Sequence, residues 1–325
     1  LAARCLLACI GTAGCGLTYW LGRELCDHSV GLLAGLYTAL SPTLSLFSVL
    51  ILSETAFATS LVLSLIAIVR MARLTPTGGV VSASIVAGVL IGLATYMRPT
   101  WLYVGPVIAV TVVWLRRGDR PLKSLCPSLA WMLVGLVVTL VPWVGRNFVV
   151  TGHVVPTTLW VGPSLYDGLH SDATGDSDMT FFERDQLMNS MSEYEMDREY
   201  RRRAMSFAWE HPGRTLWLAV EKQRRYWSLV PNAAQFRDGA SLLIVLLTTL
   251  PLFLLAPIGA WVSRRDLAVI VLSAGSVLMF AALHLLFVGS LRYRLPAEYP
   301  LAVLAAIGVR QLLLRTGLLT RTAVL

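Results

Sequence analysis

Arginines that stand beside long apolar runs are the residues of this chain with the clearest chemical potential. These arginines are Arg98, Arg146, Arg292 and Arg294, and we consider Asn147 and Tyr293 with them as sequence neighbours. A guanidinium presents forked N–H donors that match the oxygens of a carboxylate or a phosphate. A charge near membrane depth is costly and is usually paired. These residues therefore predict a site for a phosphate-bearing amphiphile.

Two acids occur close to the same positions. Glu54 opens an apolar run, and Glu298 follows Arg292 and Arg294. Each acid is expected to be an ion-pair partner of an arginine or an N-terminal helix acid stabilised by the helix dipole. Pairs that merely hold helices together therefore remain an alternative to a binding site.

The composition defines what must position these residues. The chain has 325 residues, of which 56% are hydrophobic and only 14% are charged, with a mean hydropathy of +0.66. Soluble globular domains carry about 25% charged residues. The values exclude a soluble enzyme, a disordered chain and a disulfide-rich secreted module, and they predict an all-α polytopic membrane protein.

The apolar runs predict about nine transmembrane helices, because a span needs about 20 apolar residues. Their expected positions are 5–22, 29–47, 54–69, 80–97, 100–115, 127–145, 240–262, 267–289 and 297–314. They form N-terminal membrane helices within 1–145 and C-terminal membrane helices within 239–325, separated by the polar segment 146–238.

The position of the charges predicts the topology. The net charge is +8, but segment 146–238 is slightly acidic, so the basic excess lies in the short connections between apolar runs. This is the positive-inside pattern and not a nucleic-acid stripe. It predicts a cytoplasmic Leu325, an extracytoplasmic Leu1 and an extracytoplasmic segment 146–238, and it excludes nucleic acid as a partner.

The outer segment is expected to be mostly helical. A helical pattern runs from Glu183 to Trp209 and ends before Pro212. A second helix is expected over 213–229, with apolar, aromatic and basic residues mixed. That mixture suits a juxtamembrane helix on the bilayer surface and equally a solvated helix packed on the outer segment.

Neither a metal nor a cofactor is expected. The five cysteines show no CxxC spacing. We interpret the cluster Asp172, Asp176 and Asp178 as a solvated loop in preference to a cation site. His284 is expected to be a buried, hydrogen-bonded histidine within an apolar helix in preference to a ligand.

Several strings, in their order along the chain, resemble the GT-C membrane glycosyltransferases. More narrowly, the chain is similar to the polyprenyl-phosphate-sugar-dependent group with protein O-mannosyltransferases and lipid A aminoarabinose transferases. The strings are Tyr19-Trp20-Leu21-Gly22-Arg23, Ser41-Pro42, Ser53-Glu54, Gly88 with Gly92, Arg98-Pro99, Val141-Pro142-Trp143 with Arg146-Asn147, His211-Pro212 with Lys222, and Arg292-Tyr293-Arg294-Leu295-Pro296.

The resemblance implies an inverting hexosyl- or pentosyltransferase that moves a sugar from polyprenyl phosphate to an acceptor hydroxyl. It places Arg98, Arg292 and Arg294 near the donor phosphate, Tyr293 at the sugar or lipid pocket, and Glu54 against an arginine or the sugar. It also implies that the catalytic carboxylate lies in a first outer loop, so this residue and one more helix are expected upstream of Leu1.

The resemblance further implies a polyprenyl-phosphate-linked donor, a lipid, glycan or protein acceptor, and a multi-pass protein of the cell membrane with an extracytoplasmic active site. Two alternatives stay open. One is a non-catalytic assembly or binding protein of the same fold. The other is a transporter of a lipid-linked sugar, although the chain shows no matching halves with polar groups at mid-membrane.

Overall fold

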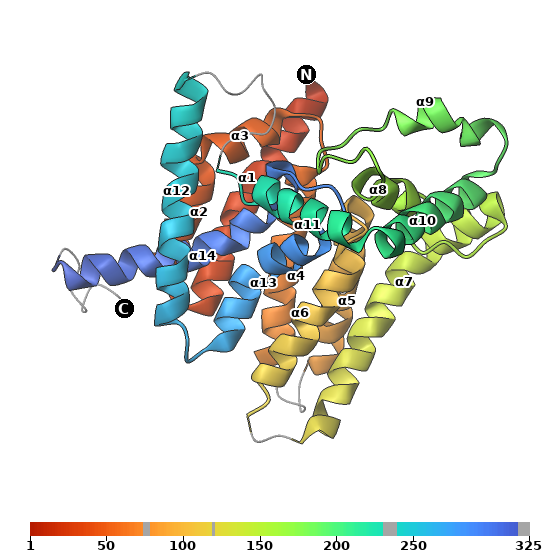
Figure 1. The fold of residues 1–325 in the computed structure, drawn as a ribbon. Coiled ribbons are helices and arrows are strands. Elements are labelled where there is room, and N and C mark those ends of the chain that lie inside the picture. Colours follow the sequence, from red (N-terminus) through yellow and green to blue (C-terminus); the bar gives the residue numbers. More distant parts are fainter. Residues whose placement is uncertain (74–78, 119–120, 230–238, 318–325) are drawn as a thin grey trace. The chain divides into compact units, whose positions relative to one another are not determined.

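The computed structural model describes residues 1–73, 79–118, 121–229 and 239–317, which contain helices and no strand. This confirms the all-α prediction. The elements are α1 (Ala2–Leu25), α2 (His28–Leu40), α3 (Pro42–Val49), α4 (Glu54–Arg73), α5 (Val80–Met97), α6 (Trp101–Leu115), η1 (Leu122–Leu125), α7 (Cys126–Thr151), α8 (Val161–Gly168), α9 (Phe181–Asp185), η2 (Leu187–Asn189), α10 (Glu193–Glu210), α11 (Pro212–Tyr226), α12 (Gly239–Val262), α13 (Leu267–Leu283) and α14 (Leu291–Arg315) (Figure 1).

The described helices provide six or seven of the predicted membrane spans at full length. Six of them are long and apolar enough to cross a bilayer, namely α1, α4, α5, α7 with η1, α12 and α14. The pair α2 and α3 adds a broken span, and α6 and α13 are shorter apolar helices. Together these elements correspond to the nine expected runs, and they confirm a multi-pass membrane protein.

The expected helix over 29–47 is wrong in one respect, because it is broken. α2 and α3 meet at Ser41 with a bend of 60°. The Ser41 hydroxyl accepts the Leu44 N–H at 3.5 Å, and Pro42 occupies the first helical turn. A serine cap followed by proline starts a new helix, since proline lacks the N–H that would continue the previous one.

The helix ends near the last predicted hairpin also differ from expectation. α13 stops at Leu283, so His284 lies beyond the helix and not within it as expected. α14 begins at Leu291, six residues earlier than the predicted start at 297. Arg292 and Arg294 therefore lie in the first turn of a helix.

The single helix expected from Glu183 to Trp209 is wrong at its start. The structure has α9, η2 and then α10, with Gln186 in the left-handed region at φ 48°. α10 begins with a capping box, in which Ser192 and Glu195 satisfy each other's backbone N–H groups. The second predicted helix is confirmed as α11.

The chain forms two compact units. The first comprises the described parts of 1–139, 235–278 and 295–325, and the second those of 140–234 and 279–294. In the first unit α4 is the central helix, with Phe57, Leu61 and Leu65 fully buried, and it packs against α1, α5 and α6 (Figure 1). In the second unit α8 packs on α10 around an aromatic cluster that includes Phe181 and Tyr200.

Glycine controls how closely α5 and α7 approach each other in the first unit. A Cβ at Gly88 would collide with the carbonyl oxygen of Met132, and one at Gly135 would collide with that of Ile85. The two backbones are therefore in direct contact, as happens where small residues line a membrane helix interface.

We expect Gly88→Ala to lower the free energy of unfolding by about 1–3 kcal/mol, because the two backbones must separate to admit a methyl group. Gly16→Ala is the control, since a Cβ at Gly16 meets nothing within 4 Å. The measurement is thermal unfolding of both variants in the same detergent. Equal stability of the two variants would contradict direct backbone contact at Gly88.

Candidate functional site

The first unit brings together two of the predicted site residues, Glu54 and Arg98. Glu54 is the first residue of α4, and Arg98 is the residue that ends α5. Arg98 Nη2 lies 3.4 Å from Glu54 Oε1, and the Arg98 and Glu54 side chains are 15% and 2% exposed, respectively. Two charges that are this far from water are compatible with folding only as a pair.

The local sequence explains why these two side chains face each other. Pro99 forces Arg98 into an extended conformation, and the backbone there has φ −148° and ψ 112°. The Arg98 N–H still caps α5 by donating to Ala94 O at 3.0 Å, and Arg98 O accepts the N–H of Trp101, which starts α6. Glu54 at the N-terminus of α4 is favoured by the helix dipole.

Aromatic rings enclose the arginine of this pair. The Arg98 guanidinium lies 5.5 Å from the ring centroid of Phe57, and Phe57 meets Trp101 edge to face at 5.9 Å. Phe57 and Trp101 are fully buried. The rings exclude water and add a cation–π contribution, so the orientation of Arg98 is fixed before any ligand arrives.

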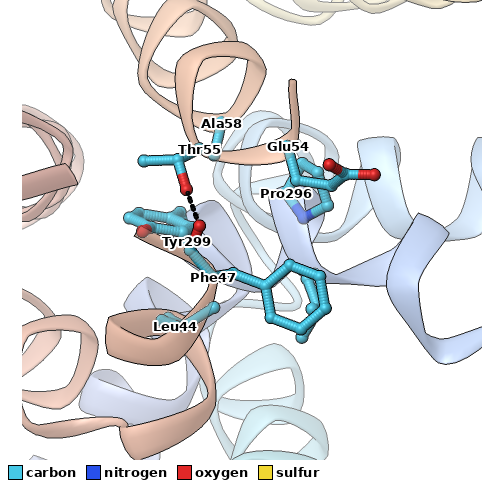
Figure 2. Close-up of a pocket in the computed structure, with 8 residues that line it drawn as sticks. Leu44, Phe47, Glu54, Thr55, Ala58, Pro296 and Tyr299 are labelled. Atoms are coloured by element: carbon cyan, nitrogen blue, oxygen red, sulfur yellow. Dashed lines mark hydrogen bonds between the residues drawn. The ribbon is translucent and has the colours of Figure 1, made fainter. Parts of the chain in front are cut away.

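A small pocket adjoins the pair in the first unit. Glu54, Thr55, Pro296 and Tyr299 line it together with apolar side chains of α3, α4 and α14, and its cavity volume of about 10 Å³ corresponds to about one water molecule. Figure 2 shows the Glu54 carboxylate on the side of Pro296, while the Thr55 hydroxyl points the other way and donates to Phe47 O at 2.9 Å. The carboxylate therefore faces an apolar recess.

In the second unit Arg294 has a role that the sequence did not indicate. Its side chain is fully buried, and Nη1 donates to Tyr226 O at 2.6 Å and to Ser228 O at 3.0 Å. These carbonyls belong to the end of α11, where the helix leaves its last acceptors without internal donors. Arg294 thus fastens the end of α11 to the start of α14.

Arg292 and Tyr293, the neighbours of Arg294, lie on other faces of the same helical turn. Arg292 is exposed, and Tyr293 is half-buried. Tyr293 stacks on the His284 ring at a centroid distance of 4.7 Å and an interplanar angle of 12°. His284 is hydrogen-bonded as expected: its Nδ1 lies 2.6 Å from Val288 O, so this nitrogen carries the proton, because a carbonyl oxygen only accepts.

Lys222 is a buried cation that the sequence analysis noted only through the resemblance. It is fully buried on α11, and its Nζ donates to Leu286 O at 2.6 Å and Leu285 O at 3.3 Å. These carbonyls lie just after α13 ends. A Cβ at Gly289 would collide with Lys222 O, so the chain after α13 passes directly against α11.

Burial lowers the pKa of Lys222 to about 8, and the negative charge of Asp167 opposes that shift. Asp167 is itself buried, and burial raises the pKa of its carboxyl group. The carboxylate accepts hydrogen bonds from Asp178 N–H at 2.8 Å and Ser177 Oγ at 2.7 Å, which lower the pKa by a smaller amount. The spacing in the sequence could have indicated that Lys222 is buried. Leu218, Lys222 and Tyr226 lie at i, i+4 and i+8, so they share one face of a helix.

Arg146 and Asn147 lie at the end of α7, in the second unit. Asn147 is buried, and its Nδ2 donates to Val155 O at 2.9 Å, which closes the turn after α7. Arg146 is exposed, donates to Asn147 Oδ1 at 3.1 Å and lies 5.3 Å from the Trp143 ring centroid. Asn147 therefore shapes the backbone, while Arg146 presents its charge at the surface.

The acidic loop of the second unit contains ion pairs. Asp172 pairs with Arg184 at 3.2 Å, and Asp176 pairs with Arg225 at 2.5 Å. Within the described residues no group of three His, Cys, Asp or Glu side chains is arranged to hold a metal ion.

These helices and this pair of buried charges define a multi-pass membrane protein with a polar site inside an apolar bundle. Residues 1–144 match the model of the dolichyl-phosphate-mannose-protein mannosyltransferase family. The match supports the resemblance found in the sequence, and this family implies a glycosyltransferase of the GT-C type with a lipid-linked sugar donor and an acceptor. No curated protein and no solved structure matches the chain significantly.

We expect Lys222→Met to remove a pH dependence of stability. The pKa of Lys222 falls from an ordinary value of 10.5 to about 8 on folding, so between these values the unfolded chain binds more protons. The free energy of unfolding of the wild type should therefore rise as the pH increases from about 8 to 10. Urea unfolding at pH 7.5 and 9.5 measures this rise.

Lys123→Met is the matched control, because Lys123 is exposed. This variant should keep the rise of the wild type, whereas Lys222→Met should lose it. The same pH slope in all three proteins would show that Lys222 is solvated.

We expect Arg294→Ala and Arg292→Ala to differ in stability. Loss of Arg294 leaves two carbonyl acceptors without their donor and should lower the free energy of unfolding by about 2–4 kcal/mol. Arg292→Ala, at an exposed position, should change it by less than about 0.5 kcal/mol. Thermal unfolding of both variants is the measurement, and equal losses would contradict the clamp formed by Arg294.

Proposed function

We propose that the protein transfers a sugar from a polyprenyl-phosphate donor to an acceptor hydroxyl on the extracytoplasmic face of the cell membrane, with inversion at the anomeric carbon. The observation that carries this proposal is the buried Glu54–Arg98 pair beside a pocket, within the segment that matches the mannosyltransferase family. If this place served only to pack helices, apolar residues would do so without the free-energy cost of burying two charges.

The proposed reaction is a single displacement. The acceptor oxygen forms a bond to the anomeric carbon, the bond from that carbon to the phosphate oxygen breaks, and the hydroxyl proton passes to a carboxylate. Polyprenyl phosphate leaves as a monoester. Negative charge grows on the departing phosphate, so fixed cations stabilise the transition state.

Arg98 fits the role of a phosphate-binding cation. A guanidinium has five N–H donors, so one arginine can hold Glu54 and an anionic oxygen at the same time. Glu54 then acts as a positioning residue that fixes the orientation of the Arg98 guanidinium group. The contacts of Phe57 and Trp101 supply the low-polarity surroundings in which such an interaction is strong.

The roles that we propose for the second-unit residues depend on whether each side chain is exposed or buried. Arg292 and Arg146 present guanidinium groups at the surface and remain candidates for the anionic part of a substrate. Tyr293 offers an aromatic ring held by His284, which suits a sugar or lipid pocket. Arg294 and Asn147 bind backbone carbonyls, so we propose that they act by positioning their neighbours.

The test of the function is a transfer assay in nanodiscs with polyprenyl-phosphate hexose and pentose donors and hydroxyl-bearing lipid, glycan and peptide acceptors. Formation of a glycoside with inverted anomeric configuration, read by NMR, is the expected result. Donor binding without transfer would favour a non-catalytic binding protein. Donor movement across sealed vesicles without transfer would favour a transporter.

We expect Arg98→Ala to weaken donor binding by about tenfold or more, because a charge-assisted contact to phosphate is lost. Arg98→Lys should recover only part of this affinity, since an ammonium group lacks the planar fork. Arg23→Ala is the control, because Arg23 also lies near the end of a membrane helix but is exposed. Titration of a fluorescent polyprenyl-phosphate sugar measures the three affinities, and wild-type binding by Arg98→Ala would remove Arg98 from the donor site.

A further inference from the structure

α12 and α14 cross with their backbones in contact, within the first unit (Figure 1). A Cβ at Gly259 would collide with Leu304 O, and a Cβ at Gly308 would collide with Leu255 O. Helices that touch through glycine at a crossing point diverge on either side of it. Beyond this crossing a wedge-shaped space opens between the two helix ends.

The wedge is an open groove of about 320 Å³ between the last turns of the two helices. Its walls are mainly apolar, with Ile258, Val262 and Leu312 among the lining residues. Trp261, Gln311 and Arg315 provide the polar part. Trp261 is 68% exposed, although it is the largest side chain of the groove.

A second arginine lies next to the groove. The Arg264 guanidinium is 4.8 Å from the Trp261 ring centroid, and its Nη1 donates to Trp261 O at 2.9 Å. Asp266, the acid that follows, pairs with Arg116 at 2.9 Å. Arg310, one turn before Arg315, pairs with Asp27 at 2.8 Å. The groove therefore combines apolar walls with two cationic groups, Arg315 in its lining and Arg264 beside Trp261.

We propose that this groove binds an anionic phospholipid of the bilayer. An acyl chain would lie against Ile258, Val262 and Leu312, and the phosphate would meet Arg264 and Arg315. Tryptophan and arginine at the ends of membrane helices lie at headgroup level, where basic pockets between helices recognise anionic headgroups. This proposal requires only that the protein spans a membrane, so it does not depend on the proposed glycosyl transfer.

The charge complementarity favours an anionic lipid over a zwitterionic one. Phosphatidylcholine could use the apolar walls equally well, but its choline group would oppose Arg264 and Arg315. Each arginine near a headgroup contributes enough that two together should favour an anionic lipid by about tenfold or more.

The test is native mass spectrometry of the whole chain with phosphatidylglycerol or phosphatidylcholine of the same acyl composition. We expect retention of phosphatidylglycerol at about tenfold lower lipid concentration. The double substitution Arg264→Ala and Arg315→Ala should abolish this preference. Arg117→Ala is the matched control, because Arg117 also follows an apolar helix and stacks on a tryptophan, with its guanidinium 5.7 Å from the Trp114 ring centroid.

A second variant separates the groove from general surface charge. Leu312→Trp fills the groove at a residue that is already 40% exposed, and it leaves both arginines in place. It should reduce the retention of both lipids. The proposal is overturned if the wild type retains the two lipids equally, if Leu312→Trp retains them like the wild type, or if Arg117→Ala loses the preference as the double variant does.

The last residues of the chain are the other conceivable occupant. A variant that ends at Gly317 removes residues 318–325 and leaves α14 whole. The phospholipid proposal predicts unchanged lipid retention. A clear increase would show that the chain's own end competes for the groove and would overturn the assignment of the lipid as its occupant.

Discussion

The pairing of Glu54 with Arg98 is the contact around which the first unit is arranged. A carboxylate that is 2% exposed inside an apolar bundle needs a cation, and Arg98 supplies it because α5 ends where α4 begins. Pro99 makes that ending possible, and Phe57 and Trp101 surround the cation. The cost of burying these charges explains why they specify one arrangement of α4, α5 and α6 and tolerate few others.

The second unit uses buried cations differently. Lys222 and Arg294 bind backbone carbonyls at the places where α13 and α11 end, so they replace the helical hydrogen bonds that these carbonyls lack. Lys222 ties α11 to the chain just after α13, and Arg294 ties the end of α11 to the first turn of α14. Arg292 and Tyr293 belong to that same first turn, so their positions depend on these two contacts.

Hydropathy predicted most of the fold, because each span must be about as long as the bilayer is thick. It failed where a local backbone rule interrupts an apolar run, as at Ser41-Pro42, and where a helix ends inside one, as at Leu283. Charge and spacing drew attention to Glu54 and Arg98, and the structure brings these two side chains together. They did not distinguish Arg292 from Arg294, since two residues in succession on a helical turn differ in burial only through their tertiary neighbours. The burial of Lys222 was not predicted, because its neighbours in the sequence are polar and its partners are carbonyl oxygens, which the sequence does not reveal.

The most direct test of the proposed donor site is photo-crosslinking in nanodiscs with a polyprenyl-phosphate sugar that carries a diazirine next to the phosphate. Mass spectrometry of the digested protein identifies the labelled peptides. The proposed site predicts labelling of the segment around Arg98 and of the residues that line the Glu54 pocket, suppressed by excess unlabelled donor. Suppressible labelling confined to other segments, or labelling that excess donor does not reduce, would contradict it.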